Sequence, residues 1–145
     1  MRIRSCVFAV AGLMLAGSLA VSARQAAPAA PRPGGWTLPE KADEEKNPFA
    51  GDAKAVAAGK VLYEKTCKRC HGPGGKGDGP DADPDSMEDM DLTNPRRAAR
   101  NPDGIVFYKI WNGRAKPKMP AQKDELTKDQ VWQIVSFTQT MRPKS

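Results

Sequence analysis

Two cysteines and a histidine lie close together in Cys67-Lys68-Arg69-Cys70-His71, which has the spacing C-x-x-C-H. This spacing is typical of covalent attachment of a c-type haem, in which both sulfurs bond to one porphyrin. On a helix the three side chains share one face, because residues three and four apart are neighbours there. The imidazole of His71 can then bind the iron as proximal ligand. It is the only histidine in the chain.

Two other chemistries use a C-x-x-C pair. A thioredoxin-like redox pair needs a βαβ context, and the sequence around Cys67 has no such strand pattern. A structural zinc site needs four Cys or His ligands. The third cysteine, Cys6, lies in a segment that we expect to be removed, so such a site would be one ligand short.

A sixth ligand for the iron is predicted at Met119, which stands between Pro117 and Pro120 in a segment that cannot form regular structure. A thioether is a soft ligand that suits haem iron. Met141 is a rival, but it lies on the apolar stripe of the last predicted helix. The other candidates are Met87 and Met90.

Residues 1–23 have the pattern of a secretory signal peptide. A basic start with Arg2 and Arg4 precedes the apolar run from Cys6 to Val21, and Val21-Ser22-Ala23 resembles a cleavage site. We therefore expect export to the periplasm. The alternative is an uncleaved membrane anchor, for which the apolar run is short.

The rest of the chain divides into a linker, residues 24–50, and a haem domain, residues 51–145. The linker begins with a stretch rich in Ala, Pro and Gly, which favours an extended chain. Within it, Trp36 to Pro39 can pack back on the domain, since an exposed tryptophan is unfavourable.

Composition limits the classes of function. The chain has 145 residues and a net charge of +6, and after residue 23 it carries 21 basic and 17 acidic side chains. No basic run is interleaved with aromatic residues, so nucleic acid is not an expected partner. The apolar content is low, with 13 Gly and 13 Pro. A domain with so small an apolar core is only marginally stable by itself, and a bound haem would add buried apolar surface.

Three longer helices are predicted, over about 52–69, 102–111 and from Thr127 onward. Thr127 and Gln130 form a capping box for the last helix. Gly59, in the middle of the first helix, indicates a close crossing with the last one. The glycine-rich stretch 72–80 predicts a loop, with a carbonyl near Pro80 accepting the His71 Nδ1 proton. Trp111 is a candidate donor to a haem propionate.

An acidic segment, from Asp78 to Asp91, holds seven carboxylates and no basic residue. It does not fit the EF-hand pattern, because Pro84 interrupts it and the central glycine is absent. We interpret it as a solvated loop.

The chain resembles the class I c-type cytochromes over about Asp52 to Arg142. Besides the haem motif, Gly59 and Tyr63 stand eight and four residues before Cys67, as in the N-terminal helix of that family. Phe137 resembles the aromatic residue of its C-terminal helix. Other similar pieces are 75–80 (Gly-Lys-Gly-Asp-Gly-Pro), 91–93 (Asp-Leu-Thr), 110–113 (Ile-Trp-Asn-Gly) and 119–121 (Met-Pro-Ala).

The resemblance implies an all-α fold, with three to five helices wrapped around one haem c attached through Cys67 and Cys70 and ligated by His71 and Met119. It implies a periplasmic one-electron carrier rather than an enzyme, with redox proteins as partners. Two alternatives stay open: a haem subunit of a periplasmic dehydrogenase or terminal oxidase, and a haem sensor with an open iron. Basic residues that could ring the haem edge and orient acidic partners are Lys68, Arg69, Lys116, Lys118 and Lys123.

Overall fold

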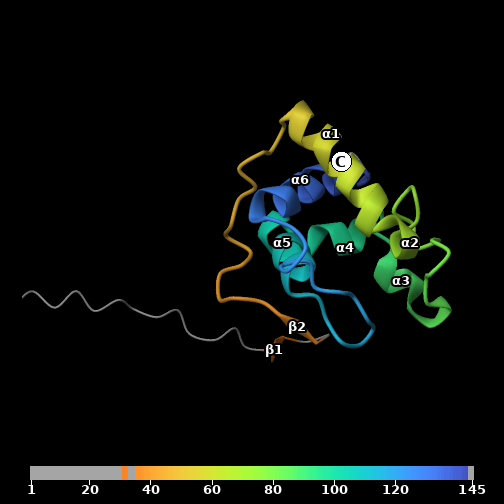
Figure 1. The fold of residues 1–145 in the computed structure, drawn as a ribbon. Coiled ribbons are helices and arrows are strands. Elements are labelled where there is room, and N and C mark those ends of the chain that lie inside the picture. Colours follow the sequence, from red (N-terminus) through yellow and green to blue (C-terminus); the bar gives the residue numbers. More distant parts are fainter. Residues whose placement is uncertain (1–30, 33–34, 144–145) are drawn as a thin grey trace, which may run out of the picture.

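The computed structural model describes residues 31–32 and 35–143 (Figure 1). The predicted signal peptide, residues 1–23, lies outside the described residues. The helices are α1 (Ala53–Thr66), α2 (Lys68–His71), α3 (Met87–Met90), α4 (Pro95–Ala99), α5 (Asp103–Asn112) and α6 (Lys128–Gln139), and a 3₁₀ turn, η1 (Pro84–Ser86), precedes α3. Two short strands, β1 (Pro31–Arg32) and β2 (Trp36–Thr37), pair antiparallel. No helix in this part of the chain is long and apolar enough to span a membrane.

The predicted all-α fold is confirmed. The described residues contain six α-helices rather than three to five, because α2, α3 and α4 are single turns of four or five residues. The predicted linker, residues 24–50, lies partly outside the described residues.

The first helix is shorter than predicted and ends before the haem motif. The side chain of Asp52 caps its N-terminus by accepting hydrogen bonds from the amides of Lys54 and Ala55. At Cys67 the helix breaks. The amides of Cys70 and His71 then donate to the Cys67 carbonyl, at 3.2 and 3.0 Å, and start a new turn. Cys70 and His71 therefore lie on α2, with Cys67 at its N-terminal cap, rather than on one helix continuous with α1.

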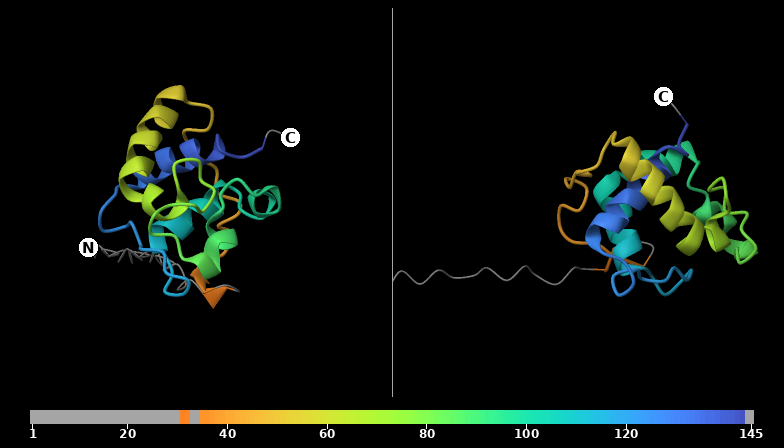
Figure 2. Two further views of the ribbon diagram at one scale, coloured as in Figure 1. Left: turned by 90° about the vertical axis from the view of Figure 1, so that its right-hand side faces the viewer. Right: turned by 45° about the horizontal axis from the view of Figure 1, so that its top comes forward.

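Helices α1 and α6 cross at close range (Figures 1 and 2). Gly59 is buried at the crossing, and a Cβ atom placed on it would overlap the carbonyl oxygen of Gln133. One turn further along α1, the ring of Tyr63 meets that of Phe137 edge to face, with centroids 5.3 Å apart. The predicted crossing at Gly59 is confirmed.

The main core lies between α5 and α6. Phe107 stacks on Trp132 with ring centroids 4.2 Å apart. The predicted capping box of α6 is present, with Thr127 and Gln130 exchanging hydrogen bonds. Helix α5 begins at Asp103, one residue later than predicted, with Pro102 in the capping position. The buried core residues are Phe107, Ile110, Val131, Trp132, Ile134 and Val135.

A second, smaller core fixes the segment before α1. We call residues 36–47 the N-terminal strap; it runs from β2 past α5 and α6 toward the start of α1 (orange in Figure 1). Trp36, Leu38 and Ala42 of the strap are buried together with Ile105 of α5. At its far end, Asn47 donates to the hydroxyl of Ser136 at 2.8 Å. This part of the expected linker is thus packed on the helical domain.

Replacement of Gly59 tests the helix crossing. We expect Gly59→Ala to lower the free energy of unfolding by about 1–3 kcal/mol or more, because the added methyl group meets backbone that cannot rotate away. Denaturant unfolding of the haem-loaded protein measures this. Gly74→Ala is the control, because nothing lies within 4 Å of that position, and we expect a change within about 0.5 kcal/mol. Equal effects of the two substitutions would contradict the close crossing.

Candidate cofactor site

A cavity lies among α1, α2, α5 and α6 and the loop that carries Met119. Cys67, His71 and Met119, three of the four predicted site residues, line it. Cys70 does not line it but lies on α2 directly before His71, and neither Cys67 nor Cys70 forms a disulfide. The apolar part of the wall comes from Leu92, Val106, Ile110 and Ile134.

A hydrogen bond at one ring nitrogen fixes the orientation of the His71 imidazole. Its Nδ1 lies 2.7 Å from the carbonyl oxygen of Met90, so Nδ1 donates and Nε2 is left for a metal. Burial lowers the pKa of His71, which keeps the ring neutral at pH 7 as a ligand must be.

The predicted acceptor for His71, a carbonyl near Pro80, is wrong. The loop after His71 turns back onto the backbone of α2 instead. The amides of Gly77 and Gly79 donate to the carbonyls of His71 and Cys70, at 2.9 and 3.3 Å. The acidic segment then brings the C-terminal end of α3 to the ring.

Met119 is the second predicted iron ligand, and it reaches the cavity from the loop between α5 and α6. Its amide and carbonyl both pair with Arg114, each at 2.9 Å. Its side chain packs against both hydrophobic clusters. The position of the sulfur is therefore supported from both the backbone and the core.

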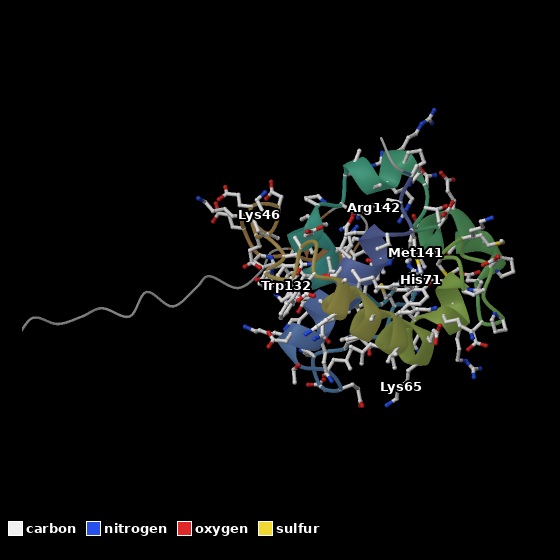
Figure 3. All side chains as sticks on the ribbon, turned by 90° about the horizontal axis from the view of Figure 1, so that it is seen from above. Lys46, Lys65, His71, Trp132, Met141 and Arg142 are labelled. Carbon is white, nitrogen blue, oxygen red and sulfur yellow. The ribbon has the colours of Figure 1, made fainter. Side chains whose placement is uncertain are left out.

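The rival methionines lie elsewhere. Helix α6 ends at Gln139, before Met141, and a Cβ on Gly75 would lie 2.7 Å from the Met141 sulfur. Met141 (labelled in Figure 3) does not line the cavity. Met87 is 45 % exposed, and Met90 packs beside Gly77.

Asp89 joins the loop that holds His71 to the loop that holds Met119. Its carboxylate accepts a hydrogen bond from Arg97 at 2.6 Å and one from Arg114 at 3.2 Å. Arg114 pairs with Met119 through its backbone, and Asp89 precedes the residue whose carbonyl binds His71. The hydrogen bonds from Arg97, and then from Arg114, hold the pKa of Asp89 below its usual value.

Three cationic side chains reach the cavity: Arg97, Lys109 and Arg142 (Arg142 is labelled in Figure 3). Burial, together with the nearby charges of Arg97 and Arg114, lowers the pKa of Lys109 to about 8. A partly buried cluster of positive charges favours an anionic group between its members.

The aromatic residue at this edge is Trp36 rather than Trp111. Trp36 lines the cavity, with the Lys109 ammonium 4.9 Å and the Arg114 guanidinium 4.3 Å from its ring centroid. Trp111 does not line the cavity. It stacks on Phe107, with centroids 5.8 Å apart, so the propionate contact expected of Trp111 is not supported.

These residues fit a covalently attached haem. Cys67 and Cys70 are in no disulfide and can form the two thioethers, a neutral imidazole and a methionine sulfur are available for iron, and apolar side chains would contact the porphyrin faces. The cations offer partners for the two haem carboxylates.

The sequence matches a family model described as cytochrome C oxidase, cbb3-type, subunit III, over residues 54–137. The chain belongs to this family of c-type cytochromes. Membership supports covalently attached haem c, and Cys67 and Cys70 fit the attachment motif.

Two solved structures are similar to this cytochrome. One is titled cytochrome CL from the marine methylotrophic bacterium Methylophaga aminisulfidivorans MPT, with a TM-score of 0.53 and 23% identity over 72% of this chain and 70% of that one. The other is titled KustC0563 c-type cytochrome, with a TM-score of 0.49 and 25% identity over 59% of this chain and 98% of that one. The first supports the cytochrome fold. No curated protein sequence matches the chain.

Sequence reasoning missed Asp89 and Arg114. Asp89 is one of seven acids in the acidic segment, and only its ion pairs set it apart from exposed members such as Asp85. The Asn94-Pro95 start of α4, which presents Arg97 to Asp89, was the available signal.

Replacement of Asp89 tests this link. The folded-state pKa is lowered, so the stabilisation is present above the unfolded-state pKa and is lost as the pH falls through the folded-state pKa. Because the Asp89 carboxylate is partly exposed, solvent weakens its ion pairs, and we expect Asp89→Asn to lower the free energy of unfolding by about 0.5–1 kcal/mol at pH 7, with a smaller difference below about pH 4. Denaturant unfolding at both pH values measures this. Asp85→Asn, at an exposed position, is the control, and an equal effect of both would contradict the link.

Proposed function

We propose that this cytochrome is a periplasmic carrier of single electrons, with one haem held by Cys67 and Cys70 and its iron ligated by His71 and Met119. The observation that carries the proposal is the position of His71 and Met119 on the same cavity, together with Cys67. One C-x-x-C-H motif corresponds to one haem.

The haem supplies an iron that cycles between the ferrous and ferric states. His71 and Met119 would both hold that iron, which would leave no ligand position open for a substrate. The hydrogen bond to the Met90 carbonyl orients His71 and makes its Nε2 more basic, and therefore a stronger ligand for iron. A methionine opposite histidine raises the reduction potential. An iron that exchanges electrons but has no open ligand position suits a carrier better than an enzyme.

Export to the periplasm is part of the proposal and is supported by the signal-like pattern of residues 1–23. Partners would be other redox proteins. Four lysines predicted to ring the haem edge are exposed: Lys68, Lys116, Lys118 and Lys123. Arg69 is exposed too, but its guanidinium pairs with Asp81 at 2.5 Å, so it contributes less to a positive field.

A second candidate is a haem subunit of a larger redox enzyme. The description of the matched family, which names an oxidase subunit, favours it. Stable co-purification with membrane or periplasmic enzyme subunits would favour the subunit, whereas isolation as a free monomer favours the carrier.

The sixth ligand is tested with Met119→Ala. In the ferric wild type we expect the weak near-infrared absorption band typical of methionine bound to haem iron. We expect the band to be absent in Met119→Ala and present in Met141→Ala. The ferrous wild type should bind carbon monoxide slowly or not at all, and Met119→Ala should bind it readily. A wild type that binds carbon monoxide without denaturation would favour the haem sensor.

The role of the exposed lysines is tested by salt. If they steer an acidic partner, raising the ionic strength from about 0.01 to 0.15 M shortens the Debye length from about 30 to 8 Å and slows electron transfer. Stopped-flow kinetics with an acidic redox protein measure the rate. Lys118→Gln should lower the rate at low salt more than Lys54→Gln, a control on the exposed start of α1. A rate independent of salt would contradict steering.

A further inference from the structure

The N-terminal strap is packed on the helical domain at both ends, although it lies before the family match, which begins at residue 54. The amide of Asn112 donates to the carbonyl of Thr37 at 2.7 Å, and the hydroxyl of Tyr108 donates to the carboxylate of Glu45 at 2.8 Å. Asn47 then anchors the strap to Ser136 of α6. These contacts hold the strap in one place over α5.

Helix α5 is shaped to receive the strap. A Cβ atom on Gly104 would overlap the carbonyl oxygen of Ala42 and lie 2.8 Å from the Cβ of Glu45. Any side chain at this position would therefore push the strap away from the helix. Ala42 itself is 1 % exposed.

The strap also reaches the haem site. Trp36 lines the cavity and covers the edge where Lys109 lies. Met119 packs against the cluster that Trp36, Leu38 and Ala42 form with Ile105. Trp36 further contacts the guanidinium of Arg114, the residue whose backbone pairs with Met119. Hence the strap supports the Met119 loop from outside the family domain.

We propose that the N-terminal strap is a working part of the haem site, in which Trp36 is a positioning residue that keeps Met119 on the iron and closes the cavity beside Lys109. The proposal rests on the proposed ligation by Met119. Without the strap, Met119 would leave the iron more often, and water would reach the cavity edge. Both changes would lower the reduction potential, because methionine and a dry site favour the ferrous state.

Competition by imidazole measures how firmly Met119 is held. An added ligand that replaces Met119 binds more tightly when the Met119-bound conformation is less stable. In the ferric full-length protein we expect Trp36→Ala to tighten imidazole binding about tenfold, equivalent to about 1.4 kcal/mol. We expect its midpoint potential, measured by spectroelectrochemical titration, to fall. Trp36→Phe, which keeps an aromatic ring, should behave nearly as wild type.

Two further variants separate this role from a general loss of stability. Gly104→Ala displaces the strap without altering a cavity residue, and it should shift imidazole affinity and potential in the same direction as Trp36→Ala. Trp111→Ala removes a tryptophan that packs on the main core outside the cavity. It should lower the stability but leave imidazole affinity unchanged.

Wild-type imidazole affinity and potential in both Trp36→Ala and Gly104→Ala would overturn the proposal. An equal shift in Trp111→Ala would overturn it too. These outcomes differ from failure of the proposed ligation, which would appear as a near-infrared band unaffected by Met119→Ala. If that band depends on Met119 while the strap variants behave as wild type, only the role of the strap is wrong.

Discussion

The contact between the backbones of α1 and α6 at Gly59 is the constraint on which the haem site depends. Because no side chain separates the helices there, Tyr63 of α1 reaches Phe137 of α6. Its hydroxyl donates to the carbonyl of Gly72, just after the haem motif, at 2.6 Å. The crossing thus fixes the direction in which α1 delivers Cys67 and α2 to the cavity. Ile134 and Thr138 of α6 form the facing wall.

Much of this arrangement could be predicted from the sequence, because its signals are local. The C-x-x-C-H spacing, the glycine at mid-helix and the capping box of Thr127 and Gln130 each state a geometric requirement within a few residues. Pro117 and Pro120 similarly predicted an extended loop in which the Met119 side chain is available as a ligand. The close approach of the helices at Gly59 and the N-terminal cap of α6 follow from such local rules.

What the sequence did not predict depends on contacts between distant segments. The partner of His71 is a backbone carbonyl 19 residues away, and any residue could supply it. Asp89 differs from its acidic neighbours only because Arg97 and Arg114 reach it. Trp36 was expected to pack on the domain, but nothing within its own segment indicated that it would lie beside Lys109 at the cavity. Tertiary packing decides all three.

The paired backbone of Arg114 and Met119 has a consequence for the speed of electron exchange. A carrier reacts quickly when its bond lengths and surroundings are nearly the same before and after the electron moves. The two backbone hydrogen bonds, the adjoining Pro120 and the packing of the Met119 side chain leave the loop little freedom to relax. With Met119 as ligand, the reorganisation energy of the site would be small, because its polar and sulfur groups are already in place.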